Sequence, residues 1–461
     1  MSERVSYPLG VNVPFAVGTF VAVALVAVST PPAGAGHLVD GRRTRAIEPV
    51  SHSLARGRYA AGTVNSDLAF WGTLTFQGRY DGFRVIDVAD PANPTVLSRV
   101  SCHGAQADVA VWETLLFRAV DRPQTRSGCG GSDTASGVPG FEGIQIFRVT
   151  DPTEPRLVKA VPVDCGAHTI TLIPQPSQDR VLLYISSSHP GFFGRSSFGN
   201  ECRAAHGRIP VVSVPIDRPR EARVVRSFPI RRGNHCHDIA VHRGVDRAAG
   251  ACWPRANVWD ISRPLYPRLL FTRTVRGVDG WHSAAFTWDG RVIVLGWEPG
   301  GGAAAECQRA DPAVERSVFF FGSGAGRRLG SWTLRRFQTA SENCSIHNYN
   351  VVPVAGRYVL VGGNYQSGTS VVDFTDPQAP RELGFSDPPP LSPTQVGGAW
   401  ASYWYNGYVY ESDMTRGLNI FRLPETLVPG QGTLSALNPQ TQERVEPSPE
   451  GNMLTALRVG G

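Results

Sequence analysis

Short stretches in which apolar and polar residues alternate run through most of the chain, and many end in a turn rich in proline and acidic residues. Alternation of this length predicts half-buried β-strands rather than helices. The clearest example is GFRVIDVADPANPTVLSRV at 82–100, with close copies at 143–161 and 369–385. Looser or truncated copies lie at 209–228, 256–272, 316–332 and 417–427. The pattern indicates one structural unit that is used repeatedly.

A second hairpin precedes most of these phrases, as in DLAFWGTLTFQG at 67–78. The unit therefore has about four strands and recurs at roughly 40 to 60 residues, which is typical of a β-propeller. Proline in the D-P-x-x-P turn fixes φ and lacks an N–H, so it ends a strand without leaving an unpaired donor. We predict an all-β fold, a seven-bladed β-propeller of four-stranded antiparallel blades over residues 50–425. The alternative is two unrelated β-sandwiches, which need no fixed period.

Composition agrees with many short strands joined by tight turns, since the chain has 50 glycines, 36 prolines and only 18% charged residues. The net charge of +6 comes almost wholly from arginine, and Lys159 is the single lysine. The chain has no basic run of the kind found in nucleic-acid-binding tails, so no nucleic-acid partner is expected. Residues 428–461 are polar and carry no strand pattern, which predicts a flexible C-terminal tail.

The N-terminal segment has the pattern of an export signal. FAVGTFVAVALVAV at 15–28 is uncharged, apolar and 14 residues long, which suits a signal-peptide core better than a membrane span. AGA at 33–35 is an A-x-A cleavage site. Residues 1–35 are thus predicted to be a signal peptide. The region before the apolar core is only weakly basic, because Glu3 offsets the charge of Arg4, so an uncleaved N-terminal anchor is the alternative. The predicted location is secreted or on the extracytoplasmic cell surface, with membrane contact only through an uncleaved segment.

An even number of cysteines fits an oxidising compartment. The eight are Cys102, Cys129, Cys165, Cys202, Cys236, Cys252, Cys307 and Cys344, and 105 pairings are formally open. Pairing neighbours in the sequence (102–129, 165–202, 236–252 and 307–344) would place each bridge inside one local unit. The chain has no C-x-x-C, so a redox motif or a zinc ribbon is not indicated.

Several phrases resemble the LVIVD-repeat proteins, a family of exported bacterial and archaeal propellers. They are RVIDVADPANP at 84–94, WHSAAFTWDGRVIVLGWEPGGG at 281–302, ENCSIHNYNVV at 342–352 and GNYQSGTSVVDFTDP at 363–377. The resemblance covers most of the chain after the signal segment and implies a seven-bladed propeller. It implies no reaction, because the biochemical role of that family is poorly defined.

Four successive units carry a histidine where their first strand begins. These residues are His168 in CGAHTITLI, His237 in NHCHDIAVH, His282 in GWHSAAF and His347 in CSIHNYNVV. The remaining three units have Asn65 or Ser66, Ala107 beside Asp108, and Gly398 at this position. First strands line the channel of a propeller, so equivalent positions form a ring at one depth. Neutral imidazoles gathered in this way bind a transition metal.

Glu298, in LGWEPGGG, ends the second strand of its unit and is expected beside His282, where it adds an oxygen ligand. The predicted metal ligands are therefore His168, His237, His282, His347 and Glu298, a set that suits Zn, Cu, Fe, Ni or Mn. Where the family often has an acidic residue before the glutamate, this chain has Trp297, which leaves a second local carboxylate in doubt. Taken singly, each histidine has a structural alternative, such as a bond to channel water.

The stretch NHCHDIAVHRG at 234–244 holds three histidines that strand alternation separates. His235 shares a face with His237 and is predicted to support it from behind. His242 falls on the other face and is predicted to be exposed. Asp238 is expected to point away from His237, so that the two form no dyad. His103 is left undecided.

Two classes of function fit the sequence. One is an exported binding propeller whose partner is an extracytoplasmic protein, a glycan or a small molecule, the glycan being suggested by the aromatic run WASYWYNGYVY at 400–410. The other is an oxidoreductase or hydrolase that uses an open position on a divalent transition metal. No G-x-S-x-G, H-E-x-x-H or P-loop motif is present. Binding is slightly favoured, because no general base stands apart from the predicted ligands. The loop EPGGGAAAEC at 298–307 is expected to lie over the channel.

The export signal leads to a direct test. We expect the native protein to be cleaved after Ala35, with Gly36 as its new N-terminus. N-terminal sequencing of protein purified from its own cells checks this, and a native chain that starts at Met1 would contradict cleavage.

Overall fold

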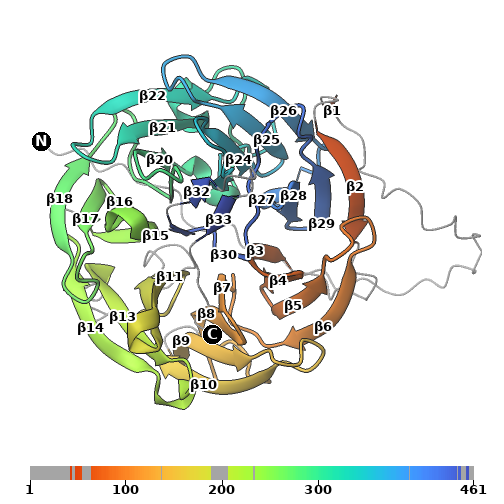
Figure 1. Ribbon diagram of the computed structural model, residues 1–461. Helices are drawn as coiled ribbons and strands as arrows, with labels where there is room; N and C mark the ends of the chain where they lie inside the picture. Colours follow the sequence, from red (N-terminus) through yellow and green to blue (C-terminus); the bar gives the residue numbers. More distant parts are fainter. Residues whose placement is uncertain are drawn as a thin grey trace, which may run out of the picture. The chain divides into compact units, whose positions relative to one another are not determined.

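The computed structural model describes residues 42–43, 47–53, 64–135, 138–187, 206–231, 234–393, 395–443, 445–447 and 453–455. The predicted signal segment, residues 1–35, lies outside this part of the chain. The described structure is all-β and propeller-like (Figure 1). Short 3₁₀ turns are η1 (Pro176–Gln178), η3 (Pro219–Glu221), η4 (Arg243–Val245), η5 (Pro299–Gly302) and η6 (Ala313–Arg316). Among the described residues, no helix is both long and apolar enough to cross a membrane.

Sets of four antiparallel strands follow one another along the chain, each built as a meander. The first set is β3 (Asn65–Trp71), β4 (Leu74–Arg79), β5 (Gly82–Asp87) and β6 (Thr95–Ser101). The next is β7 (Val109–Trp112), β8 (Leu115–Gln124), β9 (Phe141–Arg148) and β10 (Arg156–Pro162). The third is β11 (Thr169–Gln175), β12 (Arg180–Ser186), β13 (Arg208–Pro215) and β14 (Arg223–Pro229).

The fourth set is β15 (His235–His242), β16 (Arg247–Trp253), β17 (Ala256–Asp260) and β18 (Arg268–Arg273). The fifth is β19 (Ser283–Phe286), β20 (Val292–Gly296), β21 (Ser317–Gly322) and β22 (Arg328–Thr333). A nine-stranded sheet follows, which contains β23 (Asn348–Val351), β24 (Val359–Gly363), β25 (Thr369–Asp373) and β26 (Arg381–Asp387), with β1 (Arg42–Arg43) at its edge. It also contains β27 (Ala399–Tyr405), β28 (Tyr408–Asp413), β29 (Gly417–Arg422) and β2 (Glu48–Ser53).

The acidic proline turns lie between the third strand of a set and its outermost strand. Asp90 Oδ1 accepts the Ala92 N–H at 3.0 Å, and Asp151 Oδ1 accepts the Thr153 N–H at 2.9 Å. These bonds from an aspartate side chain to the backbone N–H two residues later are Asx-turns, and they close the connection between the two strands. The pairing of third and fourth strands also shifts register once in each of six sets, at Ile86, Lys159, Val212, Trp259, Phe321 and Val372. The repeat in the sequence is therefore matched by a register shift that recurs in the strand pairing.

The first strands of the sets lie side by side in a closed ring. β3 neighbours β7, followed in turn by β11, β15, β19, β23 and β27, and β27 lies beside β3 again (Figure 1). Aromatic side chains fill the space between adjacent sheets: Phe83 packs edge-on to Phe147 at 4.8 Å, and Phe320 stacks on Phe374 at 4.4 Å. Most of the aromatic run at 400–410 belongs to this core, because Tyr403, Tyr405 and Tyr410 are buried. These three tyrosines are therefore not at the surface, where a glycan would stack on them.

An N-terminal strand completes the last set of strands. The copy at 417–427 is truncated in the sequence, and β29 is its third strand. β2, from residues 48–53, pairs antiparallel with β29 and supplies the missing outer strand. A segment from the start of the propeller thus holds its final sheet.

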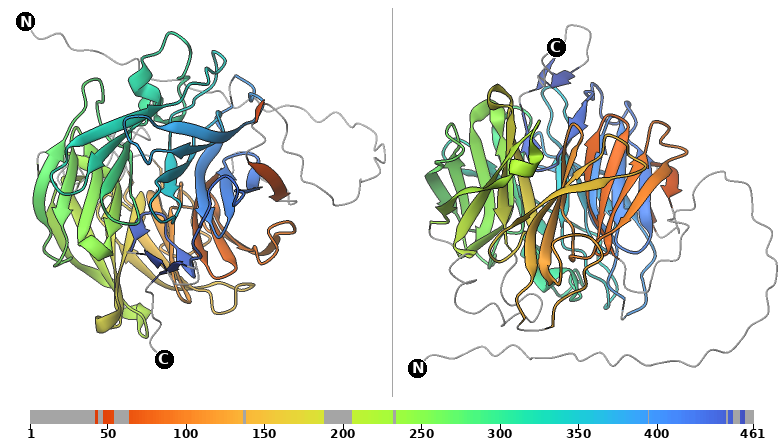
Figure 2. Two further views of the ribbon diagram at one scale, coloured as in Figure 1. Left: turned by 45° about the horizontal axis from the view of Figure 1, so that its top comes forward. Right: turned by 90° about the horizontal axis from the view of Figure 1, so that it is seen from below.

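Part of the expected tail is instead built into the fold. β30 (Ala436–Leu437) pairs with β3, and β31 (Thr441–Gln442) pairs in parallel with β15. Val428, Leu434 and Leu437 are buried. These pairings use the C-terminal ends of the first strands, so the segment crosses one end of the ring. Beyond it, β32 (Val445–Pro447) and β33 (Met453–Thr455) form a separate hairpin (Figure 2). A flexible tail from residue 428 is therefore wrong for residues 428–443.

Three sequence-neighbour pairs form disulfides: Cys102–Cys129, Cys236–Cys252 and Cys307–Cys344. Cys236–Cys252 joins two strands of one set, β15 and β16. Cys102 lies in the connection before β7 and Cys129 between β8 and β9, whereas Cys307 lies between β20 and β21 and Cys344 in the connection before β23. Cys202 of the fourth pair, Cys165–Cys202, lies outside the described residues.

Asn438 is the residue that ties the C-terminal segment to β7. Its Oδ1 accepts the Val111 N–H at 2.7 Å, and its Nδ2 donates to the Val111 carbonyl at 2.9 Å. We expect Asn438→Ala to lower the free energy of unfolding by roughly 1–3 kcal/mol, because both backbone groups of buried Val111 lose their partner. Thr433→Ala, an exposed change in the same segment, should cost less than about 0.5 kcal/mol. Denaturant unfolding followed by tryptophan fluorescence measures both, and equal values for the two variants would contradict the assignment.

Candidate metal centre

The four aligned histidines lie at the start of neighbouring first strands. His168, His282 and His347 immediately precede β11, β19 and β23, and His237 lies near the beginning of β15. The N–H groups of the first three donate to the carbonyls of Ser186, Gly296 and Gly363 at 2.7–2.9 Å. Each acceptor belongs to the end of the second strand of the same set. The same backbone contact therefore holds these three imidazoles at equivalent positions.

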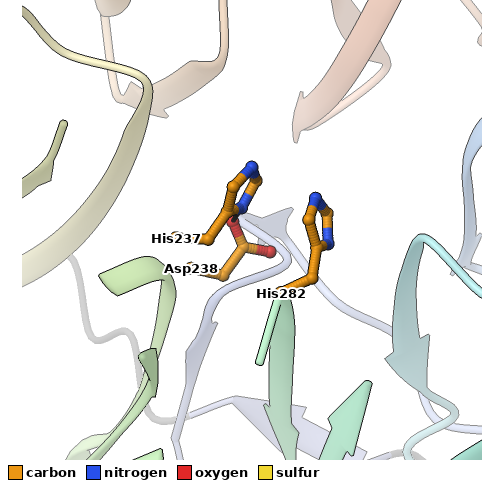
Figure 3. Close-up of side chains that lie close together, drawn as sticks. All are labelled: His237, Asp238 and His282. Atoms are coloured by element: carbon orange, nitrogen blue, oxygen red, sulfur yellow. Dashed lines mark hydrogen bonds and ion pairs between the residues drawn. The ribbon is translucent and has the colours of Figure 1, made fainter. Parts of the chain in front are cut away.

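β15 is irregular where His237 and Asp238 lie. The pairing of β15 with β16 shifts register between Cys236 and Ile239, so two residues there have no regular partner. A shift of this kind breaks the alternation of side chains. His237 Nδ1 consequently lies 3.0 Å from Asp238 Oδ1 (Figure 3). The expectation that Asp238 points away from His237 is wrong, because it assumed an unbroken strand.

The imidazoles form an arc. Ring centroids are 4.4 Å apart for His168 and His237, 3.7 Å for His237 and His282, and 4.4 Å for His282 and His347. Their donor atoms fall into two groups within 4.8 Å, His237–Asp238–His282 and His282–Glu298–His347, so that His282 belongs to both. His168 joins the arc through its Nε2, which is 2.7 Å from His237 Nε2. The structure thus brings all five predicted residues to one place.

The outer nitrogens of three rings are held by oxygen atoms. His168 Nδ1 is 2.7 Å from Asp121 Oδ2, both side chains being buried, and His237 Nδ1 bonds Asp238. His347 Nδ1–H donates to the Trp400 carbonyl at 2.5 Å. Contacts of this kind fix the ring and turn Nε2 inward, as they do for histidine ligands of metals. Asp121 was missed in the sequence, although a carboxylate inside the apolar strand β8 was a usable signal.

Glu298 follows β20 and contacts two of the histidines. Its Oε2 is 3.4 Å from His282 Nε2, and its Oε1 is 3.6 Å from His347 Nε2. The Tyr365 hydroxyl donates to Glu298 Oε1, and the Tyr365 ring lies 4.6 Å from that of His347. Tyr365 has a φ of 44°, which a non-glycine side chain adopts at a cost. Sequence reasoning missed this tyrosine, since no motif marks a residue in a turn.

Burial sets the charge state of the site. It lowers the pKa of His237 and His282 well below the usual value, helped by the neighbouring imidazoles, and lowers the pKa of His347 to about 3. These rings are neutral at neutral pH. Burial raises the pKa of Glu298 to about 8 and that of Asp238 to about 7. His282 Nδ1 is buried and has no hydrogen-bond partner in the described part of the chain. Neutral imidazoles with inward lone pairs beside a carboxylate suit a divalent transition metal.

A cavity of about 250 Å³ adjoins the arc. The four histidines and Glu298 line one side of it, and Gly301, Gly302 and Ala303 come from the glycine-rich loop that was expected over the channel. The lining is completed by Tyr80, Gln106, Tyr365, Val396, Trp400 and Met414.

Units without a histidine place other polar groups in the channel. Asp67 accepts the Tyr403 hydroxyl at 2.5 Å, and Asp108 accepts the Ile170 N–H at 2.5 Å. Burial raises the pKa of Asp67 to about 6 and raises that of Asp108 well above its usual range. This half of the ring therefore carries buried acids instead of imidazoles.

The other histidines have varied surroundings. His242 is fully buried, and its Nε2–H donates to the Trp288 carbonyl at 3.1 Å. The expectation of an exposed His242 is wrong, because β31 covers the end of β15. His235 is buried and stacks on Trp253 with ring centroids 5.5 Å apart. His103 is exposed.

Comparison with known proteins finds matches among solved structures only. No protein-family model and no curated protein matches the sequence. Among solved structures, a computationally designed protein named Ika8 is 12% identical with a TM-score of 0.44, over 78% of this chain and 83% of its own. A chain of the mitotic checkpoint complex is 12% identical with a TM-score of 0.48, over 87% of this chain and 99% of its own.

The raised pKa of Glu298 predicts the pH dependence of metal binding. Below about pH 8 the metal must displace a proton from Glu298, so its affinity should fall about tenfold for each pH unit. The three histidines with lowered pKa values stay neutral and add little in this range. Zinc titration by calorimetry between pH 6 and 9 measures the slope, and Glu298→Gln should remove the inflection near pH 8. An inflection near pH 6.5 in the wild type would contradict this assignment.

Proposed function

We propose that this chain is an exported β-propeller of the LVIVD-repeat kind that binds a divalent transition metal at one mouth of its channel. A count of seven blades is supported by the closed ring of first strands, β3 to β27. The nine-stranded sheet counts as two blades, because the named strands of its halves pair with each other only at the parallel pair β23 and β27, at Asn348↔Ala401 and Tyr349↔Ser402. Every other pairing inside those halves is antiparallel.

One observation carries the metal proposal: His168 and His237 point Nε2 at each other across 2.7 Å while a carboxylate holds each Nδ1. A carboxylate partner places the proton on Nδ1, so both Nε2 lone pairs converge. They repel unless a proton is shared between them, or unless the two rings move slightly apart and each Nε2 binds one metal ion at about 2.0–2.1 Å. His282, His347 and Glu298 extend the same inward-facing set. The four histidines and Glu298 would hold the metal. Asp121 and Asp238 would support it by bonding the Nδ1 atoms of His168 and His237.

Export is supported by the disulfides. Three cross-links within the described residues are typical of proteins that fold in an oxidising compartment. This agrees with the signal pattern at 1–35. A secreted or cell-surface location follows, with the partner reached outside the cytoplasm.

A second function, metal-dependent catalysis, is favoured by the cavity beside the arc. The ligands come from four consecutive units, so an ion held there has an open side toward the remaining three. A metal with an open position polarises a bound group or activates water. Binding remains the first proposal, since each titratable group next to the arc is itself a proposed ligand or supports one. An oxidoreductase or hydrolase is the alternative.

Metal analysis of protein purified without chelators or an affinity tag tests the centre. We expect bound transition metal in the wild type and a loss of affinity of more than about 100-fold in His237→Ala, because no distant water replaces a lost ligand. His235→Ala, if it supports His237 from behind, should lose about 10–100-fold.

Two matched changes serve as controls when the metal affinities of these variants are measured. His103→Ala removes an exposed histidine and should leave metal affinity unchanged. His242→Ala removes a buried histidine at the far end of β15 and should affect stability but not the affinity of the folded protein. Equal affinity of the wild type and His237→Ala would leave the arc as polar lining only.

A further inference from the structure

The cavity has a wall that the metal proposal does not use. It is formed by Tyr80, Trp400 and Met414, from the two sets of strands that begin with β3 and β27. Neither set contributes a histidine to the arc. The open side of an ion bound to the arc therefore faces apolar and aromatic surface, where a ligand rather than a protein group would complete the coordination.

Trp400 connects this wall to the metal centre. Its ring lies 4.6 Å from that of His347 and meets the Tyr80 ring edge-on at 6.2 Å and the Tyr365 ring at 6.4 Å. Edge-on geometry leaves ring faces and edges that a further flat ring can pack against. Trp400 is 7% exposed and is one of the side chains that line the cavity.

One polar side chain stands on the wall. Gln106 lines the cavity close to the Tyr80 phenol. Its neighbours Ala105 and Ala107 have φ values of 66° and 57°, in the left-handed region that costs a non-glycine residue about 1–3 kcal/mol. Two such residues on either side of Gln106 indicate that the backbone here is held to present its side chain to the cavity.

We propose that the cavity binds a small compound with a single aromatic ring, whose oxygen donor coordinates the metal and whose ring packs against Trp400 and Tyr80. This inference rests on the proposed metal centre. The size is set by the volume, since a cavity of about 150 Å³ accepts benzene and this one measures about 250 Å³. One ring and a short polar head fit, whereas an oligosaccharide or a peptide does not.

The test compares two probes that share a metal-binding head. Benzohydroxamate and acetohydroxamate both present the same oxygen donors, and only the first has a ring. For the zinc-loaded full-length protein, calorimetric titration should give at least tenfold tighter binding of benzohydroxamate, from burial of the ring. Trp400→Ala should reduce that ratio to about one, and both probes are titrated at saturating zinc so that a change in zinc affinity does not enter the ratio.

A tryptophan at the other end of the ring provides the matched control. Trp71, at the end of β3 near the C-terminal segment, should leave the ratio of the two probes unchanged when replaced by alanine. A wild-type protein that binds zinc but takes both probes equally would overturn the aromatic ligand and leave the metal centre standing. Equal binding of benzohydroxamate with and without zinc, or an equal loss in Trp71→Ala, would overturn it too. Failure to bind zinc would instead remove the metal centre itself.

Discussion

The metal centre depends on a backbone hydrogen bond that recurs from unit to unit. The residue before a first strand donates its N–H to the end of the second strand, as His168 does to Ser186 and His347 does to Gly363. Because the first strands also close into a ring, this bond holds His168, His282 and His347 at equivalent places in their own units. In the unit of β15 the bond is made by Asn234 to Trp253, and His237 is placed by the register shift that follows. Neighbouring rings then come within 3.7–4.4 Å of one another. The fold thus provides the position, and the sequence only has to supply histidine there.

Burial makes this arrangement costly unless the charges are balanced. His237, His282 and His347 are neutral because their pKa values are lowered, and Glu298 is protonated at neutral pH because its pKa is raised. A divalent cation reverses the second effect, since it favours the carboxylate and uses the inward lone pairs. The same cation would be supported by Asp121 and Asp238 through the outer nitrogens of two histidines. The set of groups therefore matches a bound metal better than an array of waters.

The repeat pattern was sufficient to predict an all-β, propeller-like chain, because strand alternation and the proline turns are local properties. The alignment of units also brought His168, His237, His282, His347 and Glu298 together correctly. The pairing of Asp238 with His237 was missed, since it depends on a register shift that alternation does not reveal. β2 and β31 were missed for a related reason: each is a short segment whose pairing is decided by a strand far away in the sequence. Asp121 reaches the site from β8, in a unit that has no histidine in the arc, and Tyr365 reaches it from the turn after β24, far along the chain from Glu298.

The two ends of the first strands have different surroundings. The histidines stand at the starts of β11, β15, β19 and β23, whereas the C-terminal segment pairs with the ends of β3 and β15 and bonds Val111 at the end of β7. His242, at the closed end of β15, is fully buried, while His237, at its start, lines the cavity. A strand of eight residues therefore separates a sealed end from one that adjoins a cavity. Since the segment covers the far end, the proposed metal and its ligand would exchange at the end where the histidines, Trp400 and the glycine-rich loop meet.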